Sequence, residues 1–259
     1  MKLTKTELKE FLDEKADLYN CPAFIEYDPI SIPHLFSRKE DIEISGFLAA
    51  TIAWGNRKMI LKNANRIVDL LDGSPYDFII SSDESDFKKM EGFVHRTFSA
   101  GDLIYFIKAL QHIYRNKGGL EKVFKECMKQ GSIQSAIHEF HKIFFELPHP
   151  KMTERHVSDP QKGSAAKKLN MFLRWMVRRD KRGVDFGIWK QIDPSELFIP
   201  LDLHSGNTAR QLGLLSRKAN DWKAVEELTC FLRKFDPSDP VRYDFALFGL
   251  GVNEGFNMV

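Results

Sequence analysis

Cysteine is scarce in this sequence, and the few cysteines lie far apart. The chain of 259 residues contains three of them, Cys21, Cys127 and Cys230. An odd number at this spacing provides neither a disulfide framework nor the closely spaced ligands of a zinc or iron–sulfur site. We therefore predict a reduced cytoplasmic protein that uses no metal and no cofactor.

Long apolar stretches are also missing. No stretch approaches the roughly 20 residues that a membrane span requires. The start of the chain, MKLTKTELKEFLDEK, carries charges every few residues and has no apolar core of the kind found in signal peptides. We expect no membrane association.

An excess of one charge sign is absent as well. The 38 basic and 36 acidic residues leave a formal net charge of +2. Such a balance excludes a polycation that coats nucleic acid indiscriminately. Any affinity for nucleic acid must come from a local basic patch.

What the sequence does have is helical periodicity. Apolar residues recur at intervals of three and four, as in Phe47, Leu48 and Ile52, while sustained alternation is rare. Hydrophobic residues make up 43% of the chain, enough for a large core. We predict an all-α protein, and the lack of a repeat at a fixed period argues against a solenoid.

One long polar connection divides the chain. Residues 148–163 hold three prolines, two histidines and many polar side chains. We predict a two-lobed helical bundle, with residues 1–150 as the N-terminal lobe and residues 151–259 as the C-terminal lobe, and interleaving of the lobes is left open. The cleft between two lobes is the usual place for a site.

The densest pattern follows this connection. Gly163-Ser164, followed by two alanines, predicts a helix start with Ser164 as a cap. At helical spacing, one face of this helix is apolar and the opposite face is basic; the basic residues are Lys167, Arg174 and Arg178, with Arg179 continuing the run and Lys168 at the flank. A solvated face explains this stripe, and so does a phosphate-binding surface beside a glycine turn.

An aspartate opens the next predicted helix. Asp202 comes directly after the apolar stretch Phe198–Leu201, which contains a proline. Taken alone, an aspartate there is an N-cap. It is equally suited to hold a charge in a dry cleft.

The combination of a glycine turn, a lysine in the following helix and a proline-x-aspartate motif resembles the active-site segment of the helix-hairpin-helix DNA glycosylases, nearest their 8-oxoguanine branch. The resemblance implies a helix-hairpin-helix-like motif with the turn at Gly163, a catalytic lysine at Lys167 and a catalytic aspartate at Asp202. Lys168 is the second candidate for the lysine. Ala165 stands where the family has its second glycine, the leading leucine-proline is missing, and the insert between lysine and aspartate is long.

Longer segments, including NMFLRWMVRRD, IPLDLHSGNTARQLGL and DPVRYDFALFGLG, look like those of a related uncharacterised family of bacterial proteins. A further likeness lies at Trp54-Gly55-Asn56-Arg57. In 8-oxoguanine glycosylases a similar turn fills the space left by the extruded base, which implies this role for Asn56 and Arg57. Read without the family, Gly55-Asn56 is a turn between two helices.

The implied function is base-excision repair by a DNA glycosylase that also has AP lyase activity. Its partner is double-stranded DNA with a damaged base, such as an oxidised purine, or an abasic site, and we expect a monomer. The target base must be flipped out of the stack. The implied DNA-binding residues are Gly163, Ser164, Arg174, Arg178, Arg179, Asn56 and Arg57, and candidates for the base pocket are Trp54, Trp175, His204 and Phe248.

The chemistry explains the choice of residue types. Cleavage of the N-glycosidic bond builds positive charge on the sugar, which a carboxylate stabilises. A neutral lysine amine attacks C1′ and forms a Schiff base, which permits strand cleavage. Two other functions fit the sequence: a DNA- or RNA-binding protein that keeps the fold without the chemistry, and an all-α interaction scaffold. The lesion itself cannot be predicted from one sequence.

Overall fold

The computed structural model describes residues 3–129 and 131–255. Helices dominate these residues, and the strands found among them form one short antiparallel pair, β1 (Val94–His95) and β2 (Phe98–Ser99), in which Val94 pairs with Ser99 and His95 with Phe98. The prediction of an all-α fold is confirmed. Within the described residues, no helix combines the length and the apolar character needed to cross a membrane.

The chain forms two compact units. The terminal unit comprises Met1–Phe24 and Pro160–Val259, and the central unit comprises Ile25–Asp159. The division therefore differs from the one expected at residue 150. The first helix, placed in the N-terminal lobe by sequence, belongs with the C-terminal residues because it packs along the last helix; Tyr243 Oη, for example, donates to Asp13 Oδ1 over 2.8 Å.

The central unit is built from six α-helices within its described residues. They are α2 (Lys39–Ile52), α3 (Arg57–Leu70), α4 (Pro75–Ser81), α5 (Ala100–His112), α6 (Leu120–Met128) and α7 (Ile133–Phe144). A π-helical turn, Ile113–Lys117, follows α5. Stacked and edge-on phenylalanines fill the core of this unit, with Phe47 contacting Phe106, Phe140 and Phe144.

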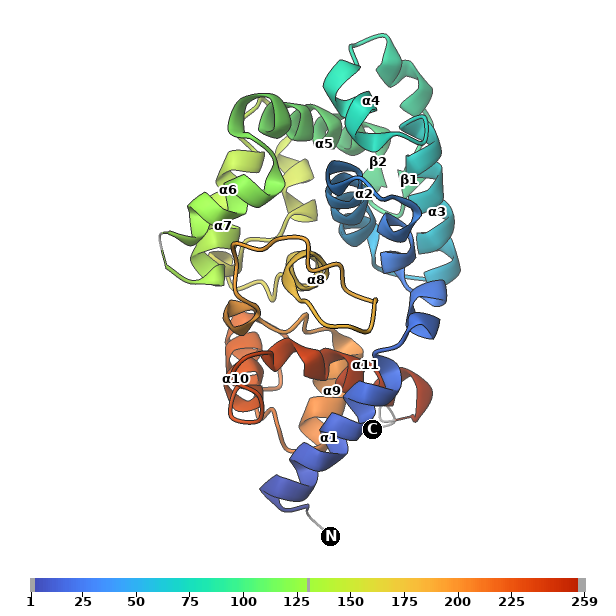
Figure 1. The fold of residues 1–259 in the computed structure, drawn as a ribbon. Coiled ribbons are helices and arrows are strands. Elements are labelled where there is room, and N and C mark those ends of the chain that lie inside the picture. The colour runs from blue at the N-terminus through green and yellow to red at the C-terminus, as the bar shows by residue number, and fades with distance from the viewer. Residues whose placement is uncertain (1–2, 130, 256–259) are drawn as a thin grey trace. The chain divides into compact units, whose positions relative to one another are not determined.

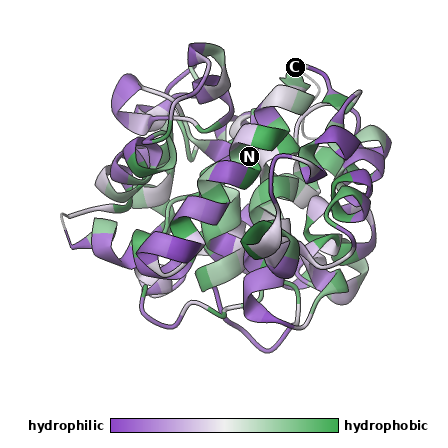
Figure 2. Cartoon of the chain, turned by 90° about the horizontal axis from the view of Figure 1, so that it is seen from above, coloured by the Kyte–Doolittle hydropathy of each residue, from purple (hydrophilic) through white to green (hydrophobic). Residues whose placement is uncertain are grey.

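The terminal unit carries the segment that resembles the glycosylase motif. Its α-helices are α1 (Lys5–Tyr19), α8 (Lys167–Val177), α9 (Leu203–Gln211), α10 (Trp222–Leu232) and α11 (Tyr243–Asn253). Helix α11 packs against both α1 and α9. Most helices carry polar and apolar residues along their length, as Figure 2 shows, which is the pattern that buries one face of each helix.

Helix α8 departs from this amphipathic pattern. From Leu169 to Val177 every residue is buried, including Arg174. The sequence indicated a helix with one apolar and one basic face, whereas the structure encloses the helix on all sides. Only its first two residues, Lys167 and Lys168, keep partial exposure.

The connection before α8 is formed by 3₁₀ turns. Among residues 148–166, all of which the structure describes, Lys151–His156 and Pro160–Lys162 form such turns and no α-helix precedes the glycine turn. The segment expected to form a helix-hairpin-helix-like motif thus consists of a 3₁₀ turn, the glycine turn and α8, without a leading α-helix in residues 148–166. This agrees with the missing leucine-proline of the leading helix.

Candidate functional site

The turn before α8 has a defined backbone. Gly163 has φ 87°, and Ala166, the residue directly before the helix, has φ 45°. Ser164 was predicted as the helix cap. Its Oγ instead accepts a hydrogen bond from Ala166 N over 3.2 Å, and Ala166 itself occupies the N-cap position before Lys167. The turn is fixed instead by residues at the start of α10, since Trp222 N donates to Gly163 O over 3.1 Å and Ser164 pairs with Asp221 in a β-bridge.

The two adjacent lysines open α8. Lys167 is the first residue of the helix and Lys168 the second, and both are partly buried. Burial, together with the smaller effect of the Lys167 charge, lowers the pKa of Lys168 to about 8. The flank lysine therefore has a larger neutral fraction at physiological pH than an exposed lysine has.

Asp202 is the N-cap of α9. Its Oδ1 accepts hydrogen bonds from Ser205 N over 3.0 Å and from Ser205 Oγ over 3.1 Å. Ser205 Oγ also accepts from Asp202 N over 3.0 Å, which completes a capping box. The N-cap interpretation is confirmed, and the carboxylate stays partly exposed. A capping role alone explains the presence of an aspartate here.

A third charged residue, Asp244, interacts electrostatically with both Lys167 and Asp202. Asp244 lies in the first turn of α11, and its carboxylate is buried. The pKa of Asp244 is raised to about 7, and burial is the largest cause of this rise. The charges of Arg174 and Lys167 oppose the rise, whereas the charge of Asp202 adds to it. Lys167 and Asp202 therefore both lie within electrostatic range of one buried carboxylate in the terminal unit.

Two of the predicted pocket residues meet beside this cluster. The rings of His204, on α9, and Phe248, on α11, lie edge to face with centroids 6.2 Å apart. The Phe24 ring also contacts Phe248, with centroids 6.2 Å apart. His204 is exposed and Phe248 is partly buried, so this aromatic group is accessible to a ligand.

A protein-family model matches most of this chain. The model described as "Protein of unknown function (DUF2400)" matches residues 28–253. The chain belongs to this family. Comparisons with the curated proteins and with the solved structures gave no match.

The DUF2400 match begins at residue 28 and ends at residue 253, so it includes segments of both units. Among the α-helices of the described residues, it leaves out only α1. The likeness to an uncharacterised family, expected from the sequence, is thereby confirmed. The family description states no function, so the chemistry of the site depends on its residues.

Two arginines predicted to contact DNA do not lie on the surface. Arg174 and Arg178 are each 3% exposed. Arg174 Nε donates to Asp185 Oδ1 over 3.2 Å, and its Nη1 contacts Asp244. Arg178 Nη1 donates to the other Asp185 oxygen over 3.0 Å. A buried charge is costly unless it is paired, and the carboxylates of Asp185 and Asp244 pair with these two arginines.

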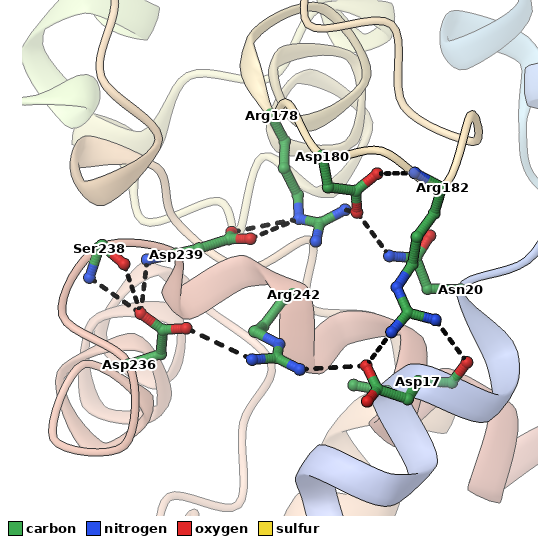
Figure 3. A pocket seen from close by; sticks show the side chains of 10 residues that line it. Asp17, Asn20, Arg178, Asp180, Arg182, Asp236, Ser238, Asp239 and Arg242 are labelled. Carbon is green, nitrogen blue, oxygen red and sulfur yellow. Dashed lines mark hydrogen bonds and ion pairs between the residues drawn. The ribbon is translucent and has the colours of Figure 1, made fainter.

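The far end of this ion-pair network borders a cavity. Arg178 Nε donates to both carboxylate oxygens of Asp239, over 2.9 and 3.1 Å, and Nη1 lies 2.8 Å from Asp180 Oδ2. Figure 3 shows these pairs lining a hollow of about 290 Å³ together with Arg182, Arg242 and other polar residues. Most of the charges drawn there pair with one another. None of the predicted catalytic or base-pocket residues lines this hollow.

The remaining predicted residues have mixed outcomes. Trp175 is fully buried in the core of the terminal unit and cannot line a base pocket. Arg179 is exposed and remains available to a phosphate. Gly163 is also exposed.

In the central unit, the turn at Trp54 is an N-cap structure. The Asn56 side chain accepts from Met59 N over 3.2 Å, and Asn56 itself is exposed. Gly55 has φ 103°, and a Cβ there would lie 2.9 Å from the Arg96 guanidinium. That guanidinium stacks over the Trp54 ring, 4.5 Å from its centroid. Arg57, like Trp54, is partly exposed. The interpretation of Gly55-Asn56 as a turn between two helices is confirmed.

Sequence reasoning missed Asp244 as a member of the site. The sequence did contain a signal, since Asp244 is the one acidic residue in the otherwise apolar stretch from Tyr243 to Gly251. A carboxylate placed in such a stretch is either paired or functional, because burying it alone is too costly. Among the described residues, no group of three or more histidines, cysteines and acidic residues is arranged to hold a metal ion.

Proposed function

We propose that this protein is a DNA N-glycosylase with AP lyase activity that acts on damaged bases in duplex DNA. The observation that carries the proposal is that Lys167 and Asp202 open two helices of one unit and act on the same buried carboxylate, Asp244. Perturbed titratable groups gathered beside an accessible aromatic surface are typical of active sites. The resemblance in sequence assigns the roles.

Each residue has a defined task in this reaction. Asp202 stabilises the positive charge that builds on the sugar as the glycosidic bond breaks. Lys167 attacks C1′ through its neutral amine, and the Schiff base that results allows strand cleavage by β-elimination. His204 and Phe248 provide an aromatic surface against which a flipped base can stack.

The choice between the adjacent lysines is part of the proposal. The distance from the glycine turn selects Lys167, whereas the pKa of about 8 favours Lys168 as the more readily deprotonated amine. We assign the nucleophile to Lys167. Lys168 is the adjacent amine, and the Lys167 charge contributes to lowering its pKa.

Borohydride trapping tests the nucleophile. Wild type is incubated with duplexes that each carry one lesion, including an oxidised purine and an abasic site, and the Schiff base is reduced to a covalent adduct. We expect adduct formation and strand scission in wild type, loss of both in Lys167→Gln, and retention of both in the matched variant Lys168→Gln. The proposal fails if wild type traps no duplex better than Lys167→Gln does. If Lys168→Gln alone loses the adduct, the nucleophile is Lys168.

A non-catalytic nucleic-acid-binding protein is the second candidate. It is favoured by the complete capping box at Asp202, which accounts for this residue without any chemistry. Binding of lesion and intact duplexes with equal affinity, together with no adduct on any duplex, would support this alternative. Salt dependence does not separate the two functions, because both require phosphate contacts.

A further inference from the structure

The buried carboxylate of Asp244 shares its guanidinium partner with a second buried carboxylate. Its side chain is 9% exposed and its partner is Arg174, whose guanidinium also donates to Asp185 over 3.2 Å. Asp185 in turn receives a hydrogen bond from Arg178 over 3.0 Å. One guanidinium is thus shared by two buried carboxylates, and Asp244 stands at the end of the network that is nearest the candidate site.

The charges that face Asp244 come from several elements. Arg174 and Lys167 lie on α8, Asp202 caps α9, and Asp185 lies in the loop after α8 and is reached through Arg174. Helix α1 places Asp13 on the neighbouring Tyr243, whose hydroxyl donates to it over 2.8 Å. Burial raises the pKa of Asp244 to about 7, so this carboxylate changes its charge near neutral pH.

We propose that Asp244 is a positioning residue of the Lys167–Asp202 site, and that the site works when Asp244 is ionised and held by Arg174. This inference rests on the proposed glycosylase function. Ionised Asp244 adds a second, buried negative charge to that of the partly exposed Asp202. This favours the transition state, in which positive charge develops on the sugar. Protonated Asp244 supplies no such charge and leaves Arg174 to Asp185 alone.

The direction of the pH dependence follows from this charge. Base release should show a rising step as pH increases through the titration of Asp244, because the ionised form is the active one. The need for a neutral lysine amine adds a separate rise at higher pH. At an effective dielectric constant of 20, one charge several ångströms away changes a rate by roughly tenfold to a hundredfold.

Asp244→Asn provides the test because it keeps an oxygen for Arg174 and removes the charge. Single-turnover base release is measured on saturating lesion duplex from pH 5.5 to 9. We expect this variant to be slower than wild type by roughly tenfold to a hundredfold at pH 8, and to lack the step near neutral pH that wild type shows. Binding of the duplex should not change, so that the effect lies in the rate constant alone.

Asp239→Asn is the matched control. Asp239 is another partly shielded carboxylate of the same network, paired with Arg178 at the edge of the hollow in Figure 3. A purely structural role for the network predicts equal loss of thermal stability and of rate in the two variants. The inference is overturned if Asp239→Asn slows the reaction as much as Asp244→Asn, or if the profile of Asp244→Asn still shows the step near neutral pH.

A second measurement does not depend on activity. The ¹³C carboxyl resonance of Asp244 is titrated in the full chain and in two single variants. Since the Lys167 charge lowers the pKa of Asp244 and the Asp202 charge raises it, Lys167→Gln should raise the midpoint and Asp202→Asn should lower it. A midpoint that neither variant moves overturns the inference, even where the glycosylase activity is present. If wild type has no activity, the proposed function fails, and moved midpoints then support only the electrostatic link.

Discussion

The two ends of helix α8 carry the same kind of residue in opposite surroundings. At its start, Lys167 and Lys168 are partly exposed beside the glycine turn. Toward its end, Arg174 and Arg178 are buried and surrounded by carboxylates. In the sequence all four belong to one basic run.

The difference teaches that a basic run is not a basic surface. A guanidinium suits burial because its planar fork can bind several carboxylates at once, as Arg178 does with three. A lysine ammonium is a point charge on a flexible stem, and burial lowers its pKa instead. The arginines are therefore paired inside the terminal unit, whereas the lysines keep partial exposure at the start of the helix.

The largest expected effect breaks the buried end of α8. Arg174→Ala should lower the free energy of unfolding by about 3–5 kcal/mol, because Asp185 and Asp244 would be left buried without this partner. The exposed Arg179 is the matched control, and Arg179→Ala should change the free energy of unfolding by less than about 0.5 kcal/mol. Urea unfolding at pH 7.5 measures both. Similar losses in the two variants would show that the arginines are not as different as we describe.

The helices could be predicted from the sequence, and the surroundings of α8 could not. Helical periodicity shows which face of a helix is apolar. It does not show whether the other face meets solvent or carboxylates, and those of Asp185, Asp239 and Asp244 come from later segments of the chain. The same limit applies to α1, whose partner α11 lies at the other end of the sequence.

At the site, the features that could be predicted were those that depend on residues close together in the sequence. The cap at Asp202 follows from residue type and position, and the structure places Lys167 at the start of a helix, close to where the glycine turn suggested. Ser164 was misassigned as the cap because the turn continues for two more residues. Asp244 was overlooked because its meaning depends on Arg174, which lies far away in sequence.

The exposed end of α8 can be probed through the titration of Lys168. Its reaction with an amine-directed acylating reagent, followed by mass spectrometry, should reach half its limiting rate near pH 8, and Lys167→Gln should move this midpoint upward by removing a positive neighbour. A midpoint near that of an ordinary lysine, about 10.4, would contradict the burial of this amine.

The same lysine should influence stability with a defined sign. Its pKa in the folded protein, about 8, lies below the ordinary value of 10.5, so the unfolded chain binds more protons between these pH values. The contribution of Lys168 to stability should therefore increase as pH rises through this window. Lys168→Met should flatten that part of the stability profile, and a profile that it leaves unchanged would contradict the assignment.

A smaller effect separates the two roles of Asp202. Asp202→Ala should lower the free energy of unfolding by about 1 kcal/mol, through loss of the N-cap of α9. Asp202→Asn keeps a capping oxygen and should lower it by less than about 0.5 kcal/mol. Thermal unfolding and base release are measured together. Loss of base release in the stable asparagine variant would assign the reaction to the charge, whereas full activity would leave the cap as the only role.

The smallest expected effect concerns the turn that sets the exposed end of α8. Ala166 has φ 45°, in the left-handed region, where an alanine costs about 1–2 kcal/mol. Ala166→Gly removes this cost but gives the unfolded chain more freedom, by about 0.4–1 kcal/mol, so that a net gain between zero and about 1.6 kcal/mol is expected. Ala165→Gly is the control. Ala165 stands where the resembling family has its second glycine, and its φ is not positive. It should therefore lose stability in thermal unfolding, and a gain at residue 165 instead of 166 would mean that the turn has the family's geometry.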